Sequence, residues 1–132
     1  MADKINFNIK IDRRALDFFQ RQAPQKLSQA REKAVTAAGM AWSDQAKSIT
    51  RAEDHIDTGL YINSIGYSTG SPSSPLYEMD HGRTKTTLRI GADVEYAQSL
   101  EKRYAIFARS LDLGSNRMKQ VAETQIKNTL GL

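Results

Sequence analysis

The chain has 132 residues, of which 39% are hydrophobic and 26% are charged, values that fit a single globular domain and leave no room for two independent cores. It contains no cysteine, which excludes a disulfide framework, a thiolate metal site and thiol catalysis. The 19 Lys and Arg exceed the 15 Asp and Glu and give a net charge of +4, but the basic residues are scattered, as on a solvated surface, rather than clustered as on a phosphate-binding track.

The first residues alternate between apolar and polar side chains. Ile5, Phe7, Ile9 and Ile11 fall on one face of residues 4–12, which predicts a half-buried strand. The start lacks the apolar core of a signal peptide, and no run of about 18 apolar residues occurs that could cross a membrane. We therefore expect a soluble, cytoplasmically made protein.

Two helices are expected next. The carboxylate of Asp12 can cap a short helix in which Leu16 and Phe19 form the buried pair. Pro24 suits the first turn of a second, long helix that continues to about Arg51. Small and apolar residues follow two adjacent stripes of this helix: Leu27, Ala30, Ala34, Ala38, Ala41 and Gln45 on one, and Val35, Trp42, Ala46 and Ile49 on the other. The alanine-rich stripe favours close packing against the sheet, with contact to another subunit as the alternative.

The long helix should end in the polar residues 52–59, where Gly59 permits a turn that other residues resist. Aromatic and β-branched residues alternate over residues 60–68 and predict a strand. Glycine, proline and serine dominate residues 66–75, a composition that predicts a long mobile loop.

The chain is expected to become ordered again near residues 76–79, to turn at His81-Gly82 and to enter a strand over residues 86–91. Leu88 and Ile90 should face inward. A short amphipathic helix is then predicted over residues 93–102.

A closing helix should begin at Ser115 as its cap and pack against the sheet. Its apolar residues at helical spacing are Met118, Val121, Ala122, Ile126 and Leu130. These elements predict one α+β domain over residues 1–132. In it, a long N-terminal helix and a C-terminal helix pack on a small, mainly antiparallel sheet, with residues 66–75 as a flexible loop.

The polar side chains that could carry chemistry lie in two separate turns: Asp54, His55 and Asp57 in one, and Glu78, Asp80 and His81 in the other. A site of two histidines and a carboxylate would require these turns to meet, because metal sites need three or four ligands on rigid elements. No nucleophile elbow, phosphate-binding loop or dinucleotide fingerprint is present. We therefore predict a protein that is not an enzyme, with no catalytic, cofactor or metal site.

An ordered series of short motifs lies between the Ala-rich helix and the closing helix. The motifs are Asp57-Thr58-Gly59-Leu60, Ser64-Ile65, Leu88-Arg89-Ile90-Gly91, Tyr96-Ala97 and Glu101. This series resembles the neck and tail-completion proteins of long-tailed bacteriophages, the family that joins tail to head, and is similar also to the minor tail proteins called Z. The resemblance gives seven structural or interface candidates: Asp57, Thr58, Gly59, Leu60, Tyr96, Ala97 and Glu101.

Elementary chemistry gives these positions structural roles. Asp57 and Thr58 can bond to nearby amides, Gly59 supplies a turn and Leu60 restarts the core, which together make a helix-to-strand corner. Tyr96 and Ala97 should pack the short helix onto the sheet, with Glu101 near its end.

The resemblance implies a subunit that forms a ring of six copies at the head-proximal end of the tail. Its partners would be further copies of itself, tail-tube or terminator proteins and head connector proteins. DNA would only pass through the lumen, and no membrane would be involved. The subunit would lie in the host cytoplasm during assembly and then in the virion, and the 66–75 loop could order only on assembly. The alternatives are a small basic nucleic-acid-binding domain and a metal-dependent hydrolase.

Overall fold

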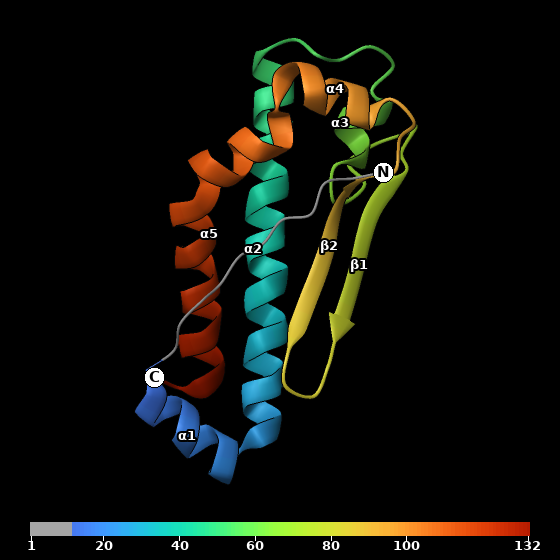
Figure 1. Ribbon diagram of the computed structural model, residues 1–132. Coiled ribbons are helices and arrows are strands. Elements are labelled where there is room, and N and C mark those ends of the chain that lie inside the picture. Colours follow the sequence, from blue (N-terminus) through green and yellow to red (C-terminus); the bar gives the residue numbers. More distant parts are fainter. Residues whose placement is uncertain (1–11) are drawn as a thin grey trace.

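The computed structural model describes residues 12–132, and the strand predicted over residues 4–12 therefore lies almost entirely outside the described part of the chain. The described elements are helices α1 (Arg13–Gln22), α2 (Pro24–Ala52) and α3 (Leu60–Ser64), strands β1 (Pro75–His81) and β2 (Thr86–Ala92), and helices α4 (Ala97–Tyr104) and α5 (Ile106–Leu130). Figure 1 shows α5, α2, β2 and β1 in this order across the molecule. The predicted α+β class is confirmed.

Helices α2 and α5 are the two longest elements and lie side by side (Figure 1). The alanine stripe of α2 is buried, and Gln45 at its end lies against Gly114 of α5. From α5, the residues Met118, Ala122, Ile126 and Leu130 are buried at helical spacing. The stripe therefore belongs to the core of the chain, as predicted, but its main partner is α5 rather than the sheet, because small side chains let two helix backbones approach closely.

The sheet packs through β2 against a second face of α2. Strands β1 and β2 pair antiparallel with Tyr77 opposite Ile90. Ile90 is buried, and a Cβ atom at Gly39 of α2 would lie only 2.5 Å from a Leu88 methyl carbon. The absence of a side chain at Gly39 thus lets β2 lie close to the helix.

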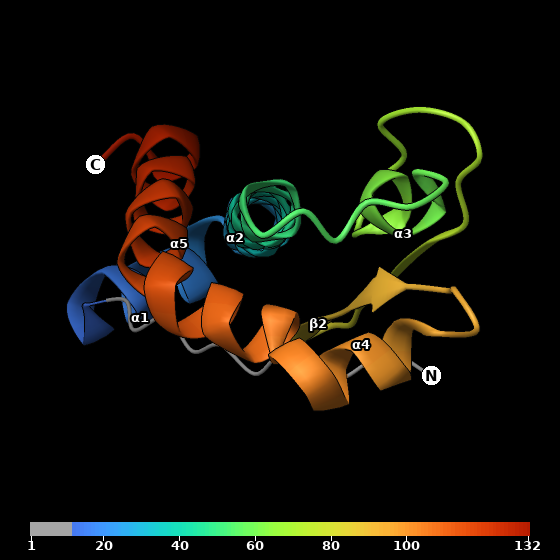
Figure 2. The ribbon, with the colours of Figure 1, turned by 90° about the horizontal axis from the view of Figure 1, so that it is seen from above.

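The segment after Gly59 is helix α3 and not the predicted strand. Gly59 has a left-handed φ of 89°, and its carbonyl accepts a hydrogen bond from the amide of Asn63 at 2.9 Å, which closes a helical turn. The buried residues Tyr61 and Ile65 are four positions apart and fit the spacing of a helix as well as the alternation of a strand. Viewed along α2, α3 and α5 lie on opposite sides of that helix (Figure 2).

Residues 65–74 contain neither helix nor strand, in agreement with the predicted loop. They are nevertheless tied to the helices. Lys47 of α2, which is buried, donates to the carbonyl of Tyr67 at 2.6 Å and to the Thr69 hydroxyl at 3.1 Å. Asn63 donates to the carbonyl of Pro72 at 3.2 Å.

One predicted helix cap is not formed, and one predicted helix start was wrong. Asp12 precedes α1, but its side chain makes no capping hydrogen bond. Helix α5 begins at Ile106, well before Ser115, because Ala105 takes a left-handed φ of 49° that ends α4 and starts a new helix. Ser115 lies inside α5, where its hydroxyl donates to the carbonyl of Asp112 at 3.3 Å. Pro24 is the first residue of α2, as predicted.

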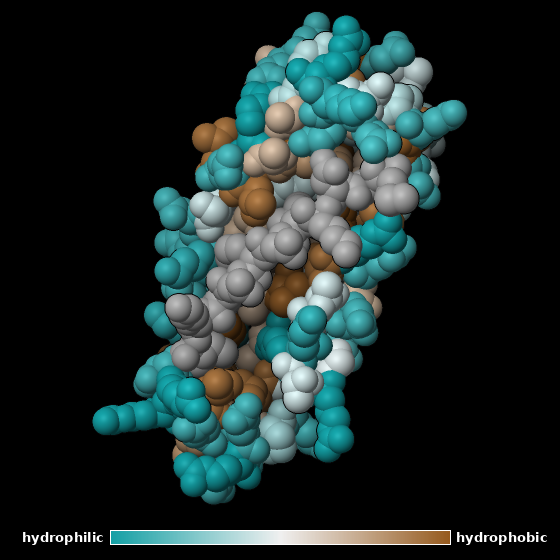
Figure 3. Space-filling view, viewed as in Figure 1, coloured by the Kyte–Doolittle hydropathy of each residue, from teal (hydrophilic) through white to brown (hydrophobic). Residues whose placement is uncertain are grey.

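On the face seen in Figure 3, hydrophilic residues cover both ends of the molecule and apolar residues appear in small patches. Among the described residues, no helix combines the length and apolar character needed to cross a bilayer.

Candidate functional site

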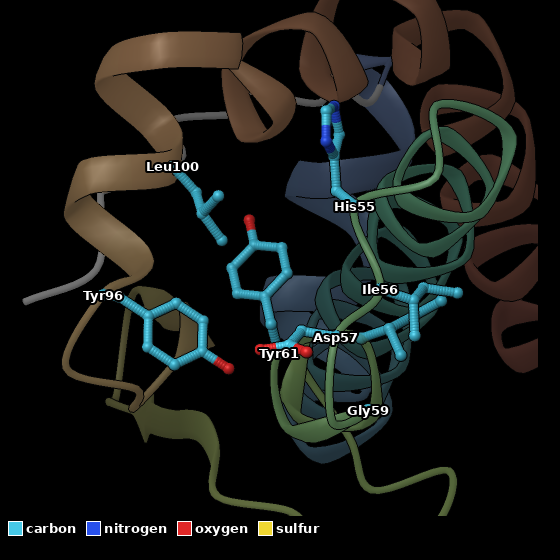
Figure 4. A pocket seen from close by; sticks show the side chains of 8 residues that line it. His55, Ile56, Asp57, Gly59, Tyr61, Tyr96 and Leu100 are labelled. Atoms are coloured by element: carbon cyan, nitrogen blue, oxygen red, sulfur yellow. The ribbon is translucent and has the colours of Figure 1, made fainter.

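The corner after α2 and the segment before α4 meet at one end of the long helix, where they form a pocket of about 250 Å³. Its lining residues are His55, Ile56, Asp57, Gly59, Tyr61, Ile62, Tyr96 and Leu100. In Figure 4, Tyr96 and Leu100 lie on the α4 side, His55, Asp57 and Gly59 lie on the side of the loop, and Tyr61 stands between them. Of the seven candidate residues, the structure thus brings Asp57, Gly59 and Tyr96 into one pocket. We call it the corner pocket.

The loop side of the corner pocket is shaped by two left-handed residues. Asp54 has a φ of 57° and Gly59 a φ of 89°, so the chain turns twice between α2 and α3. The hydroxyl of Thr58 accepts a hydrogen bond from the amide of Leu60 at 3.3 Å, as predicted, and Leu60 packs partly buried against the core. Asp57 was also predicted to bond to a nearby amide, and this prediction was wrong. Within residues 12–132 its exposed carboxylate has neither a hydrogen bond nor an ion pair.

An aromatic wall closes the other side. The rings of Tyr61 and Tyr96 lie 6.4 Å apart between centroids, and Tyr61 stacks on Phe107 at 6.0 Å. Phe107 in turn meets Trp42 edge-on at 4.9 Å, so the floor of the pocket continues into the core. Because Tyr61 is only 3% exposed, it is a rigid base for the pocket.

Tyr96 and Ala97 have different roles, although both were predicted to pack the short helix onto the sheet. Ala97 is 2% exposed and belongs to the core. Tyr96 is 41% exposed, and its ring lines the corner pocket. The prediction that Tyr96 packs the short helix onto the sheet was therefore wrong. A partly exposed tyrosine beside a carboxylate offers both an apolar face and a hydroxyl to a partner.

Glu101 does not line the pocket but caps the next helix. Its carboxylate accepts hydrogen bonds from the amides of Phe107 at 2.7 Å and Ala108 at 3.1 Å. These amides are in the first turn of α5, where backbone donors have no partner within the helix. The role of Glu101 in this structure is therefore to fix the angle between α4 and α5.

A charged cluster beside the pocket holds His55 in place. Arg109 of α5 donates to both carboxylate oxygens of Glu53, at 2.6 and 2.7 Å, and this contact lowers the pKa of Glu53 to about 2. The ring of His55 stacks on Tyr104 at 3.8 Å and lies 3.2 Å from a Glu53 oxygen. The edge of the pocket is thereby tied to both α4 and α5.

The second polar turn lies at the opposite end of α2. His81 contacts the hydroxyls of Ser28 and Thr86, each at 2.7 Å. From Ser28 to the end of α2 at Ala52 the helix rises ~36 Å, so the two histidine-bearing turns do not meet (Figure 1). The alternative of a joint two-histidine site is therefore wrong. No group of three His, Asp or Glu side chains that could hold a metal ion occurs in the described part of the chain.

The hairpin between β1 and β2 carries exposed cations at that opposite end. Arg31 of α2 donates to the carbonyl of Gly82 at 2.6 Å and to the hydroxyl of Thr86 at 2.9 Å, and so anchors the hairpin. Arg83 and Lys85 are exposed, and neither side chain has a hydrogen-bond or ion-pair partner between residues 12 and 132. We call Arg83, Thr84 and Lys85 the basic tip. It borders a wider hollow of about 470 Å³ next to α1 and α2.

Comparison of the chain with protein-family models, with curated proteins and with solved structures finds no match.

The sequence motifs identified Asp57 and Gly59 on the loop side of the corner pocket and Tyr96 on the α4 side. They missed Tyr61 and Leu100, because apolar residues at these spacings usually lie in the core and give no separate signal of a site. Ile56, directly beside Asp57, was also missed, because its exposure is known only from the structure.

Proposed function

We propose that this chain is a structural subunit of the neck of a long-tailed bacteriophage, a tail-completion protein that forms a ring at the head-proximal end of the tail and joins tail to head. Its partners would be further copies of itself, tail-tube or terminator proteins and head connector proteins. The subunit would act through its surfaces and would leave the host cytoplasm as part of the virion. Six copies would form the ring.

The observation that carries this proposal is the corner pocket. The motifs that resemble the neck family, at 57–60 and 96–101, gather at one end of α2, and this end exposes two large apolar side chains. Ile56 is 42% exposed and Tyr96 is 41% exposed. Exposed aromatic and aliphatic groups around a small hollow are typical of protein interfaces.

The size of the corner pocket supports a protein partner. The corner pocket has a volume of about 250 Å³, close to the lower end of the roughly 300–1,000 Å³ that is usual for small-molecule sites. A single side chain from another protein would fill such a hollow, as anchoring side chains do at the centres of interfaces.

Substitution of the exposed apolar residues tests the proposal in virion assembly. Ile56→Asp and Tyr96→Asp should leave a folded chain, measured by circular dichroism, but should yield separate heads and tails by electron microscopy when they replace the wild type in a phage genome that encodes it. Tyr77→Asp is the matched control, because Tyr77 is 36% exposed on β1, away from the pocket. Normal infectious particles from both pocket variants would refute the proposal.

Point substitutions are a sharper test than removal of residues 68–74. Lys47 is buried and donates to the Tyr67 carbonyl and to the Thr69 hydroxyl, so deletion of residues 68–74 would remove the second of these acceptors and would destabilise the subunit itself.

The nucleic-acid alternative makes a different prediction for binding in solution. A domain that binds DNA through many phosphates loses affinity steeply as salt rises. The neck proposal predicts association with tail or connector proteins and no strong DNA affinity in a filter-binding titration at low and high salt.

A further inference from the structure

The corner pocket combines a carboxylate with aromatic walls, a set of groups that suits a cation. Asp57 is exposed and has no partner among the described side chains. In Figure 4 its carboxylate points toward the side of the pocket on which Tyr96 lies. A guanidinium group could stack on the Tyr96 ring while it donates hydrogen bonds to Asp57, which is the geometry that arginine adopts at aromatic and acidic sites.

The basic tip supplies cations of this kind at the other end of the molecule. Arg83 and Lys85 project at the turn of the hairpin, and their side chains have no acidic partner within the described residues. Figure 1 shows this turn at one end of α2 and helices α3 and α4, whose residues line the corner pocket, at the other end. Arg31 holds the hairpin to the helix through two hydrogen bonds shorter than 3 Å, so the tip is presented on a fixed support.

We infer that the corner pocket of one copy receives Arg83 from the basic tip of a second copy of this chain. The inference rests on the proposed function, since it supplies the contact by which copies would assemble. Two different surfaces meet in such a contact, so it is heterologous, and repetition of it builds a ring if the rotation closes and a filament if it does not. Charge complementarity would set the orientation of the copies.

Charge reversal at each end tests this pairing. Asp57→Arg alone and Arg83→Glu alone should each raise the dissociation constant for self-association by about tenfold or more, measured by sedimentation velocity over a range of concentrations. Asp112→Arg and Arg117→Glu are matched controls for the change in net charge, because both residues are exposed on α5. They should associate like the wild type, and circular dichroism should show that all four variants are folded.

Restoration separates a direct contact from a general charge effect. The double variant Asp57→Arg with Arg83→Glu should associate again, and so should an equal mixture of the two single variants, because every tip then finds a pocket of opposite charge. Tyr96→Phe should retain association and Tyr96→Ala should weaken it, since the ring is the stacking surface.

The outcomes are distinct from those of the virion experiment. A wild-type chain that stays monomeric at all concentrations overturns this inference, and so does self-association that is unchanged by both charge reversals. In either case the neck proposal is decided by the particles formed with the Ile56 and Tyr96 variants.

Discussion

Gly66 is the residue at which two constraints coincide. Its φ of 73° is left-handed, and a Cβ atom there would lie 1.8 Å from the hydroxyl oxygen of Ser43. The left-handed backbone costs a residue with a side chain about 1–2 kcal/mol, and overpacking of a core adds about 1–3 kcal/mol. Gly66→Ala should therefore lower the midpoint of urea unfolding strongly.

Two comparisons separate these causes. Gly131→Ala is a control for the backbone alone, because Gly131 has a φ of 71° and nothing lies within 4 Å of its Cβ position. Addition of Ser43→Ala to the Gly66→Ala variant should recover only the part of the loss that is due to the clash with the Ser43 hydroxyl. If Gly66→Ala costs no more than Gly131→Ala, the contact with Ser43 is not limiting.

Glu53 predicts a dependence of stability on pH. Its pKa is lowered from 4.5 to about 2 by the hydrogen bonds from Arg109, so the folded state favours the ionised carboxylate. The stabilisation is fully present above the pKa of the unfolded chain and is lost as pH falls from about 4.5 toward 2. Glu53→Gln should therefore be less stable than the wild type near neutral pH and nearly equal to it near pH 2.

The measurement is a set of urea titrations of both proteins from acid to neutral pH. Glu95→Gln is the control, since Glu95 is exposed and forms no ion pair within residues 12–132. A difference between Glu53→Gln and the wild type that stays constant across the acid range would contradict the assigned pKa.

Backbone conformation was predictable from the sequence only where glycine supplies it. The turn at Gly59 was predicted because glycine adopts positive φ without strain. Asp54 and Ala105 also have positive φ, and their identity gives no comparable signal, because alanine in particular rarely occurs there. The break between α4 and α5 at Ala105 was missed for this reason.

At the scale of elements, Glu101 couples two helices. It lies on α4 and accepts hydrogen bonds from the Phe107 and Ala108 amides of α5. Glu101→Ala removes this cap and should destabilise the chain by roughly 0.5–2 kcal/mol, the usual cost of losing a helix cap. Hydrogen exchange should become faster at the two amides.

Lys102→Ala is the matched control for the Glu101 variant, because Lys102 is the next residue of α4 and is exposed. It should leave the exchange of both amides unchanged. Equal exchange rates in Glu101→Ala and the wild type would show that water or another group replaces the carboxylate.

The type of an element was predicted correctly for the long helices and for β2, and was wrong for the short segment after Gly59. The alanine stripe of α2 extends over several turns, so the helix was placed correctly. Tyr61 and Ile65 fit both periods, and residues 60–64 form a helix that follows the left-handed turn at Gly59. Ser115 follows Gly114, two residues that weaken an isolated helix, yet both lie inside α5, because packing against α2 outweighs their intrinsic preferences.

At the scale of the whole molecule, the corner pocket depends on the path of the chain. Asp57 and Tyr96 are brought together because the β1–β2 hairpin runs down α2 and returns to the same end. The motifs identified both segments, but periodicity within each segment contains no information on distances between them. The separation of His55 from His81 was unpredictable for the same reason.

The core of the described chain is continuous, which predicts a single unfolding transition. Its buried residues run from Phe19 of α1 to Leu130 of α5. Trp42, the only tryptophan, is fully buried and donates to the carbonyl of Phe107 at 3.2 Å, so its fluorescence reports on the contact between α2 and α5. Tryptophan fluorescence and far-ultraviolet circular dichroism should therefore give the same urea midpoint, as expected for one domain of this size. If fluorescence changed at a lower urea concentration than circular dichroism, the helix pair would separate before the helices unfold, and the prediction of one cooperative domain would be wrong.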